Sequence, residues 1–302
     1  SNLKKVGYLN SKKHPMTLFN KKTIKKILPN VLYKLCGHLI NINFRYYSFS
    51  YNDTSTCASD LFLYRKGEFQ THFIAENRLS ILMDQEITCH HTITCFDRNG
   101  KVVGVVNTSN PDIHTHISLS EINQGIDEYG GFIHTTRYDL DSLKKCHLKE
   151  KMEMGQHRSY TGYRSVKYGT DGVFSYVHGN FGGISIDDQG NIKLRATTRK
   201  PFCYVPQFSF DSNLKYELFF SNPTPKKIRV TLYSHSTYED NSEIGYLEIP
   251  SLGTKLFILD SELIPDKTSN CIYWVSNLPI CRSICFEHNS QTTLKTFNVF
   301  HT

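Results

Sequence analysis

The sequence predicts an all-β protein made of two tandem, similar antiparallel β-sandwich-like halves. Three observations support this fold class. Short segments of alternating apolar and polar residues recur from residue 42 onward, turns rich in Asn, Asp and Gly separate them, and the chain resembles itself after a shift of 141 residues. An N-terminal amphipathic helix and one connecting helix complete the predicted architecture.

The predicted strands are rich in β-branched and aromatic residues, and the chain has 18 Tyr and 19 Phe in its 302 residues. Such residues suit a half-buried pleated surface. Clear examples are segments 43–49, 101–106 and 226–233. Turns at 97–100, 168–172 and 187–191 contain Asn, Asp and Gly, which tolerate the positive φ angles of tight hairpins.

Two helices are predicted from spacing and composition. Residues 1–35 contain nine Lys and no acidic residue, and their apolar residues recur at spacings of three and four, which is typical of an amphipathic helix. This segment either docks on an anionic surface or caps the domain with its lysines in solvent. A second helix, rich in Lys, Leu and Glu, is predicted at about 140–154.

The internal repeat divides the chain. A shift of 141 residues places Gly104 on Gly245, Ile117 on Ile258 and Phe132 on Tyr273, with the same order of strands and turns around them. The predicted parts are a basic N-terminal segment 1–35, a first half 36–138, a helical and Gly/Tyr-rich connector 139–176 and a second half 177–302.

The charge and the cysteine content indicate which partners and which cellular compartment to expect. The net charge is +7, but outside residues 1–35 the chain has 26 basic and 28 acidic residues, which disfavours a nucleic-acid partner. The nine Cys form no Cys-x-x-Cys pair, and no apolar leader begins the chain. We therefore expect a cytoplasmic protein with free thiols, peripheral to a membrane if the lysine-rich segment docks there.

The first candidate site lies in residues 155–190, which hold eight of the 18 Gly together with aromatic and hydrogen-bonding residues. Aromatic rings stack on the C–H faces of sugars, while Arg, His and Asn side chains bond their hydroxyl groups. The alternative is that the glycines form hairpin turns and the tyrosines pack between sheets. The predicted ligand-binding residues are His157, Arg158, Tyr160, Tyr163, Arg164, Tyr176, His178 and Asn180.

The second candidate site is a metal centre made of His114, His116, His134 and Glu121. Alternate residues of a strand share a face, so His114 and His116 could grip one divalent transition metal. The fragment resembles the His-x-His-x4-Glu portion of the first cupin motif, and this resemblance implies a metal-dependent enzyme. Against this, residues 113, 115, 117 and 119 form an apolar face, which directs both histidines outward. The adjacent His90 and His91 must point to opposite faces, and we expect one of them to be packed.

The preferred interpretation is a non-catalytic protein that binds a carbohydrate, a glycan precursor or another small polar ligand, with no assigned catalytic residue or cofactor. The first alternative is a His-ligated, cupin-like enzyme acting on a small polar substrate. The second is a structural or assembly protein whose two halves pack in a homo-oligomer.

Overall fold

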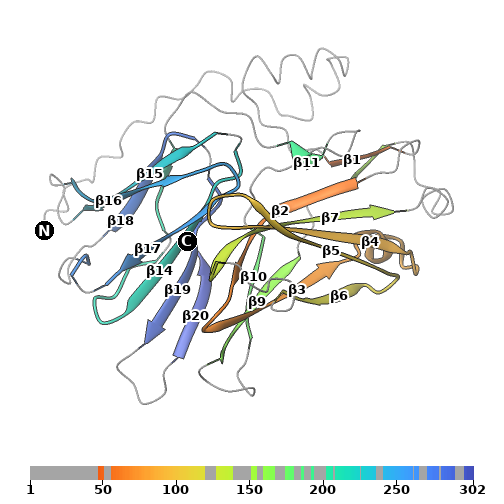
Figure 1. Cartoon of the computed structure of the whole chain (residues 1–302), viewed down its shortest axis with the longest axis horizontal. Helices are drawn as coiled ribbons and strands as arrows, with labels where there is room; N and C mark the ends of the chain where they lie inside the picture. The colour runs from red at the N-terminus through yellow and green to blue at the C-terminus, as the bar shows by residue number, and fades with distance from the viewer. Residues whose placement is uncertain are drawn as a thin grey trace, which may run out of the picture. The chain divides into compact units, whose positions relative to one another are not determined.

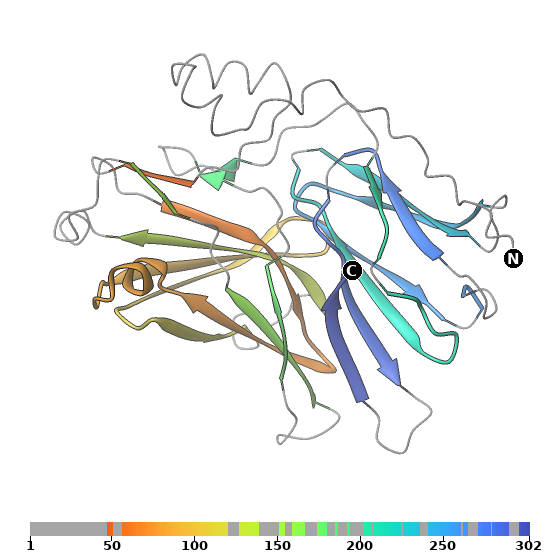
Figure 2. The ribbon, with the colours of Figure 1, turned by 180° about the vertical axis from the view of Figure 1, so that it is seen from behind.

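The computed structural model shows an all-β chain, drawn in Figure 1 and from behind in Figure 2. It describes residues 47–50, 56–119, 127–138, 151–154, 159–166, 174–179, 185–186, 192–193, 202–206, 208–224, 226–235, 241–260, 262–264, 271–278, 280–289 and 296–302. The all-β prediction is confirmed. Within these residues, no helix is long and apolar enough to cross a membrane.

Eight strands form two antiparallel four-stranded sheets, which we call the first set. One sheet has the order β2-β7-β4-β5, with bounds Thr56–Arg65 for β2, Tyr129–Tyr138 for β7, Cys89–Phe96 for β4 and Val102–Asn110 for β5. The other has the order β10-β9-β3-β6, with bounds Ser175–His178 for β10, Tyr160–Ser165 for β9, Phe69–Glu76 for β3 and His114–Ser118 for β6.

The eight strands from β13 to β20 form two more four-stranded sheets, the second set. One has the order β13-β18-β15-β16, with bounds Phe202–Tyr204 for β13, Cys271–Ser276 for β18, Ile228–His235 for β15 and Asn241–Ile249 for β16. The other has the order β17-β14-β19-β20, with bounds Thr254–Leu259 for β17, Lys215–Ser221 for β14, Ile284–Asn289 for β19 and Thr296–His301 for β20. When the strands are matched in chain order, both sets have the same pairing order.

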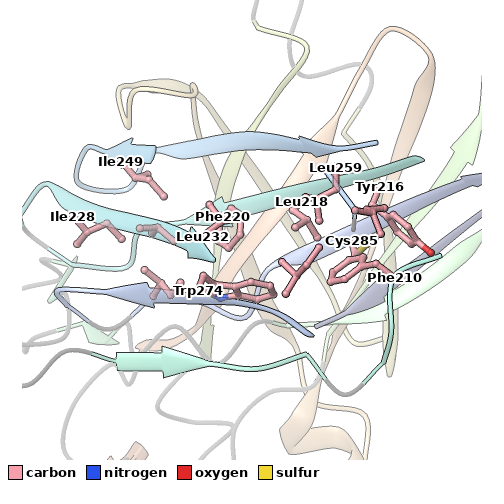
Figure 3. Packing of buried hydrophobic residues seen from close by; sticks show 14 residues of the cluster. Phe210, Tyr216, Leu218, Phe220, Ile228, Leu232, Ile249, Leu259, Trp274 and Cys285 are labelled. Atoms are coloured by element: carbon pink, nitrogen blue, oxygen red, sulfur yellow. The ribbon is translucent and has the colours of Figure 1, made fainter. Parts of the chain in front are cut away.

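Each set has its own apolar core. In the first set, Phe62, Phe73 and Phe132 come from both sheets, and the ring centroids of Phe62 and Phe73 lie 5.0 Å apart. In the second set, the Trp274 ring contacts the edge of Phe220 at 5.3 Å, in the cluster drawn in Figure 3. Fully burying an aromatic side chain stabilises a fold by roughly 1.5–3 kcal/mol, so these two clusters are a major source of stability.

A third cluster joins the two sets. Phe219, Phe286 and Val299 of the second set pack with Phe69 and Tyr163 of the first. Strand β14 therefore buries both faces, because its neighbours Leu218 and Phe220 point into the core of the second set. This double burial explains the uninterrupted apolar run at the end of β14.

An ion pair crosses the same contact. Arg65 ends β2 and donates from Nη1 to Glu217 Oε2 at 2.7 Å, with side-chain exposures of 12% and 13%. The guanidinium lies over three Phe rings, with its carbon 4.1 Å from the Phe69 centroid and 4.5 Å from the Phe286 centroid. His288 also lies 2.9 Å from Glu217 Oε2. Burial alone would raise the pKa of Glu217, but the His288 hydrogen bond and the Arg65 charge lower it to about 2.

The offset of 141 residues also matches a detail of the pairing. In β5, Gly104 follows the bulged Val103, and in β16 Gly245 follows the bulged Ile244. The offset is not uniform, however. Ile117 is buried whereas Ile258 is 40% exposed, so these two residues are not structural equivalents. A side-chain period of two makes a one-residue slip sufficient to reverse the face.

Three local features differ from expectation. Lys151–Met154, predicted as the end of the connecting helix, form strand β8 and pair with β1 (Tyr47–Ser50). Strand β9, assigned to the connector, and strand β10, which crosses the predicted boundary between connector and second half, complete a sheet of the first set. Backbone pairing with distant strands has overridden local helix propensity. An unpredicted helix, α3 (Arg78–Met83), begins at Asn77, whose side chain accepts from Ser80 N.

The short sheet β11-β12 pairs Ser185–Ile186 with Ile192–Lys193. The predicted N-terminal helix and residues 140–150 of the connecting helix lie outside the described residues.

Glu217→Gln should lower the free energy of unfolding by about 3 kcal/mol, because the change leaves Arg65 buried without a counter-charge. Urea denaturation at pH 7 measures this. The matched control is Glu248→Gln, which breaks the exposed Lys227–Glu248 pair and should leave the free energy of unfolding nearly unchanged. Equal effects of the two substitutions would contradict the role assigned to the buried pair.

Candidate functional site

The outward side of the β10-β9-β3-β6 sheet gathers histidines and aromatic rings. Alternation places every second residue of β3, β6 and β9 on this side, opposite the buried core positions. We call it the histidine–aromatic face. Its members are Gln70, His72, His114, His116, Tyr160, Gly162, Arg164, Phe174, Tyr176 and His178.

Tyr176 is the most prominent ring of the face, with 44% exposure. It pairs across β10 and β9 with Gly162, which in turn pairs with His72 of β3. A Cβ atom added to Gly162 would lie 2.5 Å from a Tyr176 ring carbon. The missing side chain at Gly162 is therefore what lets the tyrosine ring lie against the sheet.

Phe174 connects the ring of Tyr176 to the polar groups. Its centroid lies 5.8 Å from that of Tyr176 and 5.4 Å from that of His72. The Arg164 guanidinium carbon lies 5.0 Å from the same centroid. Gln70 Oε1 accepts from Arg164 Nε at 3.1 Å and also from Nη2, which fixes the cation beside the ring.

The histidines line the other parts of the face. His72 Nε2 lies 3.1 Å from His116 Nδ1, so one ring donates to the other. Burial, followed by the His116 and Arg164 charges, lowers the pKa of His72, which favours the neutral ring. His178 lies between Tyr160 and His301 of β20, with ring centroids 6.1 and 5.2 Å away.

The structure thus brings together parts of both predicted sites. Tyr160, Arg164, Tyr176 and His178 from the ligand prediction share the face with His114 and His116 from the metal prediction. Tyr163 does not: it is buried, donates to the Leu63 carbonyl at 2.8 Å and packs on Phe286. His157, Arg158, Asn180 and Glu121 lie outside the described residues.

His134 lies in the core, apart from His114 and His116. It is fully buried, and its Nε2 lies 3.0 Å from Nδ1 of the buried His91. The expectation that one of His90 and His91 is packed is confirmed. In the described part of the chain, no three His, Cys, Asp or Glu side chains are grouped to hold a metal ion.

The hydrogen-bond partners assign a tautomer to each buried histidine. Thr115 donates to Asn110 Oδ1 at 2.8 Å, so its oxygen accepts from His91 Nε2 at 3.3 Å. His91 Nδ1 then accepts from His134 Nε2, and Ser159 donates to His134 Nδ1 at 3.5 Å. His91 carries a single ring proton, on Nε2, in this network. Burial, with a smaller effect from His90, lowers the pKa of His91 to about 4.

The sequence did not predict His72 or Gln70 as part of a site, and Phe174 lies in the candidate segment 155–190 but is not among the predicted binding residues. The alternation of β3 directs His72 outward, but no local signal identifies β9 as its neighbour. No protein-family model matches the chain, and no curated protein shows significant sequence similarity to it. What the histidine–aromatic face can bind must therefore be inferred from the residues of the face themselves.

His91 should make stability fall in mild acid. Its pKa is lower in the folded chain than the ordinary 6.5, so the unfolded chain takes up the proton first. Neutral His91 contributes about 3 kcal/mol to the free energy of unfolding. This contribution is complete above about pH 6.5 and is lost as the pH falls toward 4. We expect His91→Gln to reduce the difference in unfolding free energy between pH 7 and pH 4.5.

Urea titrations at both pH values measure this difference within one variant. A loss of stability that the substitution causes equally at both pH values therefore does not affect the difference. His114→Gln on the exposed face is the control and should keep the wild-type difference. An unchanged difference in His91→Gln would contradict the stabilising role of neutral His91.

Proposed function

We propose that this protein binds a carbohydrate or glycan precursor on the histidine–aromatic face, without catalysing a reaction on it. The observation that carries the proposal is the exposed Tyr176 ring lying over Gly162, with Phe174 and Arg164 beside it. An exposed ring backed by a sheet offers an apolar surface to the C–H face of a sugar.

The polar groups around the ring suit hydroxyl groups. Arg164 can donate several hydrogen bonds, and its contact with Gln70 limits the entropy lost when it binds. His72 uses Nε2 in its hydrogen bond with His116, which leaves Nδ1 to bond a ligand hydroxyl group. Ring surface and hydrogen-bonding groups therefore lie within one four-stranded sheet.

We also propose that the two sets arose by duplication of one sandwich-like half. The identical strand order, the two separate cores and the bulge–glycine pairs at residues 103–104 and 244–245 support this. In the second set, the corresponding outward face of β14 and β19 is buried against the first set. Only the first copy thus has this face exposed.

Tyr176→Ala should weaken binding about tenfold or more, because it removes the central stacking surface. A glycan array of neutral and uronic-acid oligosaccharides, followed by calorimetry on any glycan retained, measures the effect. Tyr246→Ala is the matched control, since Tyr246 is also exposed, at 55%, and also lies beside an arginine. The proposal fails if no glycan binds or if both substitutions weaken binding equally.

Gly162→Ala tests the geometry separately. The added methyl group must displace the Tyr176 ring, a flexible side chain, so binding should weaken while the melting temperature changes little. Calorimetry and thermal denaturation of the same sample give both values. Wild-type affinity in Gly162→Ala would show that the position of the ring over the glycine is irrelevant.

A further inference from the structure

A pocket lies on the outward side of the β2-β7-β4-β5 sheet of the first set. It has a volume of about 480 Å³ and spans β5, β4 and β7. The size is within the range of small-molecule sites. Its lining includes His90, Thr92, Asn107, Ser109, Thr135 and Arg137.

The register arranges these six residues in two rows. His90 pairs with Ser109 and Arg137, and Thr92 pairs with Asn107 and Thr135. Every one of them is polar and none is acidic, although exposed strand positions elsewhere on β5 carry apolar residues such as Val102 and Val105. The pocket therefore combines one permanent positive charge, an imidazole ring and uncharged hydrogen-bonding groups.

One hydrogen bond orients the Asn107 amide in the lining of the pocket. Thr92 Oγ1 donates to Asn107 Oδ1 at 2.7 Å. Because that oxygen is engaged, the Asn107 amide presents its NH₂ group as a donor. Arg137 is exposed and has no carboxylate partner within the described residues. Both groups favour an anion.

The matching sheet of the second set, β13-β18-β15-β16, carries different charged residues on the corresponding side. Counting from the matching bulges, Arg229 and Glu248 occupy the positions of Thr92 and Asn107. There, the cations are compensated: Lys227 pairs with Glu248 at 2.7 Å and Arg229 with Glu243 at 4.0 Å. Among the described residues, the cations on this side of the second set thus have carboxylate partners, whereas Arg137 in the first set has none.

We propose that this pocket binds a phosphate ester of a small hydroxylated molecule. Arg137, whose planar guanidinium can bond two phosphate oxygens, and His90 hold the phosphate. The hydroxyl groups of Thr92 and Thr135 and the Asn107 amide bond the rest of the ligand. The two sheets of the first set share one core, and their outer faces lie on opposite sides of it. The pocket is therefore separate from the histidine–aromatic face.

Calorimetry with glycerol 3-phosphate, inorganic phosphate and glycerol tests the proposal. We expect saturable binding of glycerol 3-phosphate, weaker binding of inorganic phosphate and none of glycerol. Arg137→Ala should weaken glycerol 3-phosphate binding at least tenfold, the usual size for a charge-assisted pair. Arg229→Ala, which removes the same charge from the matching sheet of the second set, should bind as the wild type does.

Asn107→Asp provides a second test that keeps the fold. The carboxylate can still accept from Thr92 but places a negative charge at the phosphate site, so binding should be lost. Tyr176→Ala should leave the binding of glycerol 3-phosphate unchanged. This result would distinguish the pocket from the proposed glycan site on the histidine–aromatic face. Undiminished binding in Arg137→Ala or Asn107→Asp, equal loss in Arg229→Ala, or no saturable binding would overturn the proposal.

Discussion

The contact between Arg65 and Glu217 is the constraint on which the arrangement of the sheets depends. A guanidinium surrounded by three Phe rings has lost most of its hydration, and burial lowers its pKa. Only a carboxylate at hydrogen-bond distance compensates this loss. Because Arg65 belongs to the first set and Glu217 to the second, the charge is satisfied only when the two sets meet in one register.

This contact also decides which surfaces are available. Docking buries Phe219 and Phe286 of the second set, and their sheet becomes an internal layer with both faces covered. On the outward side of the matching sheet of the first set, Tyr176 is exposed. The two sheets differ in coverage because an apolar outer face must be covered, whereas a polar and aromatic one tolerates solvent.

A buried polar network further distinguishes the two cores. His91 occupies the position that Ile228 has in the second set, and His134 that of Ser276. The second core therefore has no titratable pair at this point, while the first has two hydrogen-bonded imidazole rings. Such a network specifies one packing arrangement, since every donor needs its acceptor.

Local patterns in the sequence predicted the all-β class, the turn at 97–100, the match of Gly104 with Gly245 and the outward direction of His114 and His116. Each follows from local spacing or backbone preference, and the alternation of β6 is a direct consequence of the strand period. Tertiary structure decided that Tyr163 packs inside, that β9 joins β3, and that His72 completes the face. Strand neighbours and the coverage of a sheet depend on contacts between residues far apart in the chain, and no local pattern specifies those contacts.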